Sequence, residues 1–194
     1  MSLVQISAPA VEPISVAEAK VHLRVFDTSE DLLIAMLISS ARRYAEAYCG
    51  RSFITQQWRW VGDYFPVCAH LERGPFQSID AIGYTDMAGA VQSIATPTAP
   101  DWAIDLTGPT ARVAPGFGRT WPQTLPQIAA AHIDYTTGYG DAATDVPEGI
   151  RHWLLVRVNT AYENREEFAV MARGTVSAMP YVDSLLNPYR VEIA

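Results

Sequence analysis

The sequence predicts an α+β protein in which helices flank an inserted, small antiparallel β domain. Apolar residues recur at three and four positions over residues 15–49 and again after residue 145, which is the period of amphipathic helices. Between residues 53 and 137 the period changes to two, and Gly and Pro separate the short apolar segments, as in antiparallel strands. The expected domains are an N-terminal helical part over 1–52, a β-rich domain over 53–144, and a C-terminal helix with its tail over 145–194.

Length and composition agree with a globular protein. The chain has 194 residues, of which 49% are hydrophobic, enough for one ordinary domain or two small ones. The net charge of −7 argues against a protein that binds nucleic acid through a basic surface. Cys49 and Cys68 form no zinc or disulfide pattern, so we expect reduced thiols. We find no signal peptide in the first thirty residues and no apolar run that could span a bilayer, and expect a soluble, intracellular protein.

Two helices are expected near the N-terminus, after an extended arm over residues 3–14. Ser15 and Glu18 have the spacing of a capping box, so a short helix begins there and runs to about Leu23. Thr28 or Ser29 is expected to cap a second, longer helix. Gly50 ends it.

The middle of the chain predicts about six short strands. Residues 53–65, "FITQQWRWVGDYF", alternate between two faces, which indicates a strand with one buried side. Residues 78–94 predict two strands around a turn at Asp86–Gly89. Further strands are expected at 101–106, 111–115 and 130–137.

The stretch "GYGDAATDVPEGIR", residues 138–151, joins the last strand to the third helix. Gly138 and Gly140 lack the third glycine and the lysine that a phosphate-binding loop requires, so we interpret them as a sharp turn. Asp145 and Glu148 are expected to form a capping pair for a helix that reaches about Arg165. A further short helix is expected over 181–186.

No pattern in the sequence indicates catalysis. The four histidines, His22, His70, His132 and His152, fall in different predicted elements, and no nucleophile or metal-ligand motif is present. The carboxylates of "YENREE", residues 162–167, spread around the helix and are typical of a charged helix end. We therefore expect no enzyme activity, no cofactor and no metal.

Aromatic residues gather in the β segment and leave two interpretations open. They could form a platform for a sugar or another ligand, because aromatic faces stack on both sugars and bases. Alternatively, they fill the core of a small sheet, which is the interpretation we favour. The residues concerned are Trp58, Trp60, Tyr64, Tyr84, Trp102, Phe117 and Trp121.

Four ordered blocks of the sequence resemble the head-tail connector family of long-tailed bacteriophages and prophages. The blocks are "PISVAEAKVHLRV", "EDLLIAMLISSARRYAEAYCGRSFITQQW", "IDYTTGYGDAATDVPEGIRHWLLVRVNTAYENRE" and "LLNPYRV". They cover about half of the chain directly, chiefly the helices and the C-terminus. The resemblance implies a helical connector core, into which the β-patterned residues 53–137 are inserted as a departure from the smaller members.

The resemblance implies a structural role in the virion, at the head-tail junction. Such connectors form rings of about twelve subunits beneath the portal protein, extend the DNA channel and present a surface for the next stopper or tail protein. DNA passes through such a channel without sequence-specific contacts, and an acidic subunit gives an acidic lining to which DNA does not adhere.

Two groups of residues are candidates for these contacts. Arg42, Arg43 and Glu46 lie off the apolar stripe of the second helix and could pair with Glu163 or Glu166 of a neighbouring subunit, the alternative being ordinary solvated charges. The tail offers a possible portal contact, the alternative being that it packs on its own subunit. The tail residues concerned are Leu185, Leu186, Pro188, Tyr189 and Val191.

Overall fold

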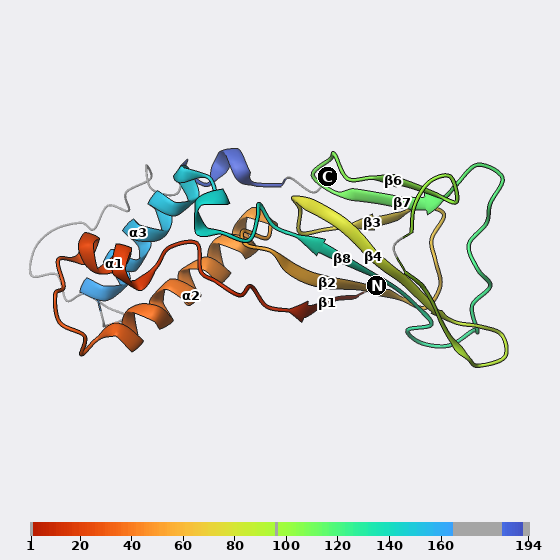
Figure 1. Ribbon diagram of the computed structural model, residues 1–194, viewed down its shortest axis with the longest axis horizontal. Coiled ribbons are helices and arrows are strands. Elements are labelled where there is room, and N and C mark those ends of the chain that lie inside the picture. Colours follow the sequence, from red (N-terminus) through yellow and green to blue (C-terminus); the bar gives the residue numbers. More distant parts are fainter. Residues whose placement is uncertain (1, 96, 165–183, 192–194) are drawn as a thin grey trace, which may run out of the picture. The chain divides into compact units, whose positions relative to one another are not determined.

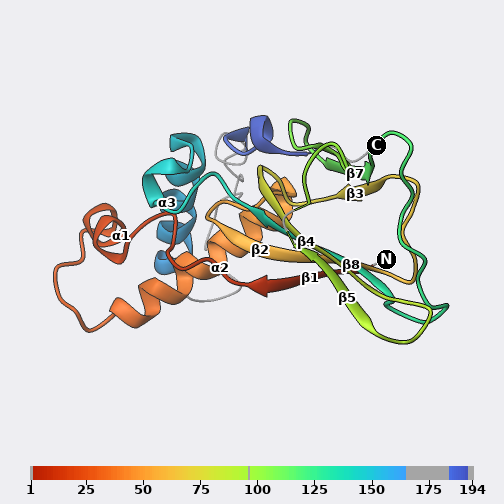
Figure 2. The same cartoon turned by 45° about the vertical axis from the view of Figure 1, so that its right-hand side comes forward.

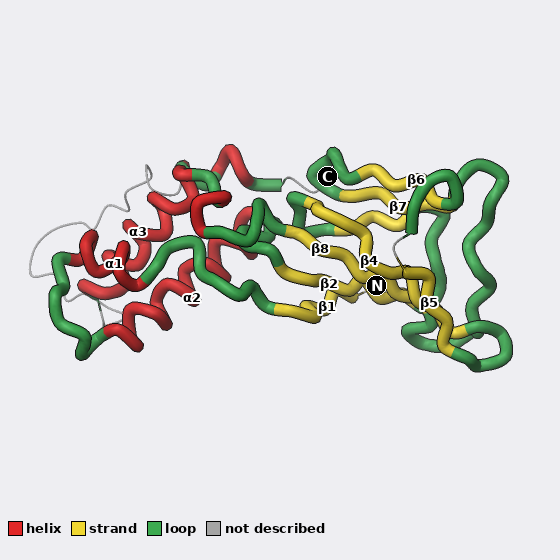
Figure 3. Tube along the Cα trace, in the orientation of Figure 1, coloured by secondary structure: helices red, strands yellow, loops and turns green. Residues whose placement is uncertain are grey.

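The computed structural model describes residues 2–95, 97–164 and 184–191, and the chain divides into two compact units (Figure 1). The β unit comprises residues 1–10 and 55–139, and the helical unit comprises residues 11–54 and 140–194. Strands lie in the first and helices in the second, so the mixed α+β class is confirmed (Figure 3). The unit boundaries differ from the predicted ranges mainly at the N-terminus, because residues 1–10 lie with the β unit.

Among the described residues, the β unit contains eight strands in two antiparallel sheets. The larger sheet has the order β1-β2-β8-β4-β5, and the smaller has the order β3-β7-β6. Two strands were not predicted from the sequence: β1, expected only as an extended arm, and the three-residue β3. The strands are β1 (Ser2–Ser7), β2 (Gln56–Gly62), β3 (Ala69–Leu71), β4 (Phe76–Thr85), β5 (Val91–Ala95), β6 (Trp102–Asp105), β7 (Ala111–Pro115) and β8 (Ala131–Thr137).

One core cluster joins the two sheets. Trp60, Ile82 and Ile133 contribute from the larger sheet, and Leu71 and Val113 from the smaller. The alternation of β8 is complete, since every second residue from its first to its last is buried. The strand period in the sequence therefore corresponds to one buried and one outer face.

The outer face of the larger sheet carries a cross-strand ion pair. Arg59 of β2 lies opposite Asp134 of β8, and its Nε and Nη2 donate to the two carboxylate oxygens at 2.6 and 2.7 Å. The hydrogen bond to Asp134 is the main reason that the pKa of Arg59 is raised. This bidentate geometry fixes the register between the two strands.

Gly83 of β4 is a glycine because His132 of β8 occupies the space above it. The two residues are register partners, and a Cβ placed on Gly83 would lie 2.1 Å from His132 Nε2. The imidazole is half-buried there, and burial lowers its pKa. The pair is a local packing unit in which the ring covers the glycine backbone.

The helical unit is built from α1 (Val16–Leu23), α2 (Asp31–Cys49) and α3 (Glu148–Glu163). The predicted capping box of α1 is present, since Ser15 Oγ accepts from Glu18 N and Ser15 N donates to Glu18 Oε2 at 2.8 Å. The backbone hydrogen bond from Ser15 is the largest cause of the lowered pKa of Glu18. α2 begins differently from the prediction: its N-cap is Glu30, which makes no side-chain cap, whereas Gly50 ends the helix with φ +66° as expected.

The joint between β8 and α3 is a turn, but its details differ from the sequence prediction. Gly138 has a φ of +131°, which favours glycine. Gly140 gives room for Asp145, whose Oδ2 would lie 2.2 Å from an added Cβ. Asp145 accepts from Ala142 N at 2.9 Å and so caps the 3-10 turn Ala143–Asp145, not α3. The N-cap of α3 is Pro147, without a side-chain cap, so the predicted capping pair with Glu148 is wrong.

A buried ion network centred on Arg42 of α2 joins three segments of the helical unit. Arg42 Nη1 donates to Glu46 Oε2 and Arg42 Nε to Glu12 Oε2, each at 2.7 Å. Glu46 Oε1 accepts from the backbone N–H of Phe53 at 2.9 Å. Burial lowers the pKa of Arg42, but the hydrogen bond to Glu12 and the charge of Glu46 outweigh it, so that its pKa is raised overall. The arm at Glu12, the middle of α2 and the turn at Phe53 are thereby held together.

The first prediction concerns the space above Gly83. We expect Gly83→Val to lower the free energy of unfolding by about 1–3 kcal/mol, because the new side chain and the His132 ring cannot occupy the same volume. Urea denaturation of the purified protein measures it. Ser93→Val, at the exposed register partner on β5, is the matched control and should change stability by less than about 0.5 kcal/mol. If adding His132→Ala to Gly83→Val recovers none of the lost stability, the packing explanation is wrong.

The second prediction concerns the ion network. We expect Glu46→Leu to lower the free energy of unfolding by about 3 kcal/mol, because it breaks a buried ion pair. This value is at the lower end for such a change, since Arg42 keeps Glu12 as a partner. Glu46→Gln retains an acceptor for Phe53 N and should cost less. Arg43→Leu, one position beyond Arg42 but exposed, serves as the control in the same denaturation experiment. Equal stabilities of Glu46→Leu and Arg43→Leu would contradict the account.

Candidate assembly surfaces

The predicted interface residues of α2 fall into two classes. Arg42 and Glu46 are buried, at 5% and 7% exposure, and their charged groups serve the ion network described above. Arg43 is exposed. In the single chain, therefore, only Arg43 of this set presents its charge on the surface.

Of the acidic partners predicted for these residues, Glu163 is the last residue of α3. Glu163 is exposed, and Glu166 lies outside the described residues. Within the described part of the chain, neither Arg43 nor Glu163 takes part in an ion pair. An intermolecular pairing of the two stays a prediction.

The described part of the C-terminal tail packs on its own helical unit. Leu186 is 1% exposed, so it is a core residue in the single chain. Arg51 Nε donates to Tyr189 O at 2.6 Å, and Val191 N donates to Cys49 O at 2.9 Å. This is the alternative that the sequence left open. Of the predicted short helix at 181–186, residues 181–183 lie outside the described residues, and the described tail contains the 3-10 turn Asn187–Tyr189.

Side chains along the tail add specific contacts at the end of α2. Tyr48 Oη donates to Asn187 Oδ1 at 3.2 Å, and the guanidinium of Arg190 lies 5.2 Å from the centre of the Tyr48 ring. A Cβ on Gly149 would lie 3.0 Å from the Tyr189 hydroxyl, so the small residue at the start of α3 makes room for the tail. Leu185, Tyr189 and Val191 are half-buried and Pro188 is exposed. A partner could contact these four residues without opening the core.

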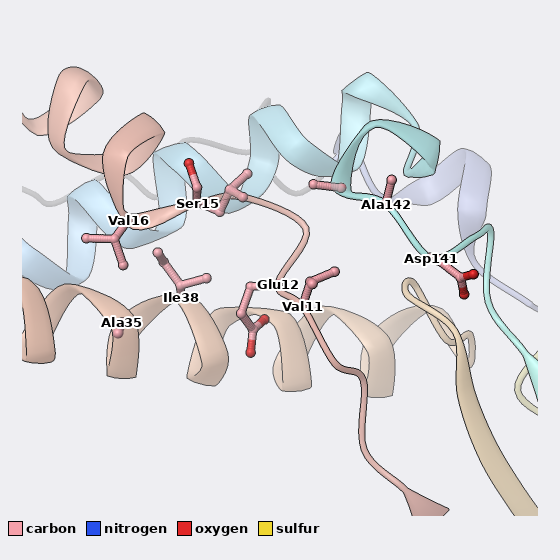
Figure 4. Close-up of a pocket in the computed structure, with 10 residues that line it drawn as sticks. Val11, Glu12, Ser15, Val16, Ala35, Ile38, Asp141 and Ala142 are labelled. Atoms are coloured by element: carbon pink, nitrogen blue, oxygen red, sulfur yellow. The ribbon is translucent and has the colours of Figure 1, made fainter.

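An apolar groove of about 520 Å³ lies beside the arm of the helical unit (Figure 4). Two of its polar residues are already engaged, since Glu12 pairs with Arg42 and Ser15 belongs to the capping box. The groove therefore offers mainly apolar contact, with Asp141 as a further polar residue of its lining. Its lining residues are Val11, Glu12, Ile14, Ser15, Val16, Ala35, Ile38, Asp141, Ala142 and Ala143.

The aromatic residues of the β unit are used mainly in its core. Trp60 and Trp102 are buried, and Trp121 stacks on Phe65 with ring centres 4.4 Å apart. Trp58 lies beneath the guanidinium of Arg73, which is 5.3 Å from the ring centre. Tyr84, half-buried, meets the edge of Phe65. Of the predicted platform only Tyr64 and Phe117 are strongly exposed, so the faces needed to stack on a sugar are largely covered.

A cavity of about 200 Å³ in the β unit is lined in part by His70, Glu72 and Tyr135. The Tyr135 hydroxyl donates to the backbone oxygen of Glu72 at 3.0 Å, and burial raises the pKa of this tyrosine. No hydrogen bond between His70 and the Glu72 carboxylate occurs in the described structure.

The remaining reactive groups lie in different elements of the fold. His22, His70 and His152 are exposed in different elements, and His132 covers Gly83. Burial raises the pKa of the Cys49 thiol to about 11, so it is protonated and a weak nucleophile at neutral pH. The described residues contain no group of three or more His, Cys, Asp or Glu side chains that could hold a metal ion. Among the helices described, none is both long and apolar enough to cross a membrane.

Comparison with known proteins relates the chain to virus-like particles. Residues 13–80 match the model of the phage gp6-like head-tail connector protein family. Comparison with curated protein sequences gives no match.

The whole fold is similar to chains of gene transfer agent (GTA) particles. A chain in the neck of an empty GTA particle, computed with C6 symmetry, aligns with a TM-score of 0.78 and 22% identity over 100% of this chain and 98% of that chain. A chain in the virion of the native particle aligns with a TM-score of 0.76 and 22% identity over the same shares. In the neck of the native particle, computed with C12 symmetry, the values are 0.73 and 23%, again with 100% and 98% coverage. The resemblance of this chain to the phage head-tail connector family, predicted from its sequence, is therefore confirmed.

Proposed function

We propose that this protein is a structural connector of a phage or phage-like particle, located at the head-tail junction of the virion. The observation that carries the proposal is the family match over residues 13–80, which contains α1, α2 and the Arg42–Glu46 pair of the ion network. The fold similarity over 100% of the chain to a chain of a particle neck supports it, because it includes the β unit that the family match covers only in part.

The connector forms a ring of about twelve subunits beneath the portal protein. The C12 and C6 symmetries of the GTA neck structures support a ring for this chain by analogy. A ring requires two different surfaces on each subunit, which meet in a heterologous contact. On the helical unit, Arg43 and Glu163 are exposed charges of opposite sign that can supply part of such a contact.

The ring extends the DNA channel and binds the next stopper or tail protein. The net charge of −7 fits this role, because an acidic surface repels the phosphate backbone and lets DNA pass without binding. Sequence-specific contacts to bases are not part of the proposal, and neither is catalysis. The tail residues Leu185, Pro188, Tyr189 and Val191 provide the portal contact from their position on the helical unit.

The direct test of this proposal is the mass of the purified protein by light scattering across a concentration series, alone and with purified portal rings. We expect closed rings of about twelve subunits, or a protein that closes into a ring when the portal is added. Negative-stain images of the same fractions identify the rings. A protein that stays monomeric and does not co-migrate with portal would contradict the proposal.

A charge-swap experiment tests the contact between neighbouring subunits. We expect Arg43→Glu and Glu163→Arg each to raise the concentration at which rings form, by up to about fivefold per contact, as for an exposed ion pair. The double variant restores the attraction with reversed signs and should assemble at the wild-type concentration. Light scattering measures all four proteins. A double variant that assembles no better than the single variants would rule out this pairing.

The tail can be tested separately from the core. We expect Pro188→Asp to abolish co-migration with the portal while leaving the melting temperature unchanged, because Pro188 is exposed and an acidic group opposes an apolar contact. Leu186→Ala is the comparison: it removes a buried side chain and should lower stability by about 2–5 kcal/mol. If Pro188→Asp binds portal as the wild type does, the portal contact lies elsewhere.

A further inference from the structure

The larger sheet of the β unit has two open edges, one formed by β1 and the other by β5. The order β1-β2-β8-β4-β5 places these strands at its two borders, and no other strand of the described residues pairs with their outer sides (Figure 2). An edge strand presents a row of backbone N–H and C=O groups that can pair with another chain. Each edge is therefore a potential binding surface.

Neither edge carries the charged residues or prolines that proteins use to prevent such pairing. Lysine, other charged residues and proline normally protect an exposed edge. The β1 sequence "SLVQIS" and the β5 sequence "VQSIA" contain none of these.

Apolar side chains accompany the open backbone at both edges. Val4 and Ile6 of β1 are 49% and 47% exposed, and Val91 of β5 is 78% exposed. The register of β5 is unbroken along the strand, and that of β1 is unbroken from Ser2 to Gln5, with one irregularity before Ser7. Both edges are thus regular enough to extend a sheet.

The direction of the strands decides which partner fits. All four pairings across the sheet are antiparallel, so β1 and β5, separated by an odd number of strands, run in the same direction. Rotation about the axis of a ring does not change the direction of a strand relative to that axis. If the sheet continued from one copy to the next, β5 of one copy would therefore pair with β1 of the next in parallel. Pairing of β1 with β1 around a two-fold axis would be antiparallel and would stop at two copies.

We propose that the β1 edge of one subunit pairs in parallel with the β5 edge of its neighbour, so that the five-stranded sheets join around the ring. This inference rests on the ring of the proposed function and names one of its subunit interfaces. The partner is a second copy of this chain because the chain itself carries both open edges, in the relative direction that a heterologous contact requires.

The dimensions of such a ring are suitable for a DNA channel. Strands spaced about 4.8 Å apart give each five-stranded sheet a width of roughly 24 Å. Twelve copies, the symmetry of one matched neck structure, would close a circle of roughly 290 Å circumference and about 46 Å radius at this spacing. A channel for a DNA duplex fits inside that radius.

Cysteine cross-linking of assembled rings tests the pairing directly. Two double-cysteine variants are made in a Cys68→Ser background: Val4→Cys with Gln92→Cys, and Val4→Cys with Ser93→Cys. Residues 92 and 93 point to opposite faces of β5, so one of them lies on the same face of the joined sheet as residue 4. Parallel neighbours bring such residues within the distance that a disulfide needs. After mild oxidation of the rings, we expect a ladder of covalent multimers on a non-reducing gel for at least one pair. Val4→Cys with Val67→Cys, at a site that is 91% exposed but on neither edge, is the matched control and should give no ladder.

The other outcomes separate this interface from the proposed function. Rings seen by light scattering without a cross-link from either pair would overturn the edge pairing and leave the connector function standing. Covalent dimers from Val4→Cys alone would indicate two-fold pairing and would likewise overturn it. A protein that forms no ring, even with portal, would overturn the proposed function and this inference with it.

A second pair of variants tests the same edges without cysteine. We expect Val4→Lys and Val91→Lys each to reduce ring formation at a given concentration, since lysine blocks edge pairing, with an unchanged melting temperature. Val67→Lys adds the same charge away from the edges and should assemble as the wild type does. Edge variants that assemble as well as Val67→Lys would overturn the pairing.

Discussion

The buried guanidinium of Arg42 is the constraint on which the helical unit depends. It binds Glu12 of the arm and Glu46 of its own helix, and Glu46 in turn accepts from the backbone of Phe53. Burying a charged group costs free energy unless the group is paired. The three segments therefore cannot separate without exposing a charge to water or leaving it buried and unpaired. The arm carries the chain in from β1, and the turn at Phe53 carries it out toward β2, so two of the three chain connections to the β unit begin at this network.

In the proposed ring, this constraint also limits how a subunit can contact its neighbours. Charges that serve the fold are not available for a second subunit, and of the predicted interface residues that are described only Arg43 and Glu163 remain exposed. Exposed ion pairs contribute little each, so an assembly built on them needs repetition and additional contacts. A ring supplies the repetition, because one weak contact recurs at every interface, and an extended backbone pairing between sheet edges would add direction and register.

The sequence predicted those elements whose patterns are local. The capping box at Ser15, the end of α2 at Gly50 and the two-residue period of β2 and β8 depend on neighbouring residues, and all are present. The pairing of β1 with β2 joins residues about fifty positions apart, and nothing in the arm itself distinguishes an edge strand from an extended linker. The burial of Arg42 and Glu46 was missed for the same reason, since their partners Glu12 and Phe53 lie outside the helix.

The tail shows a similar limit. Its apolar residues were correctly recognised as needing a partner, but the sequence could not distinguish a portal surface from the end of α2 on the same chain. Gly149 was the available signal, because a small residue at the start of α3 leaves space for Tyr189. Asp145 was misassigned because its side chain caps a 3-10 turn that has no sequence pattern distinct from that of a helix start.

An electron cryo-microscopy reconstruction of the complex with the portal would test the central claim most directly. The account predicts a closed ring of identical subunits, related by rotation, around a channel that admits a DNA duplex. Subunits bound singly to the portal, or dimers related by a two-fold axis, would contradict it.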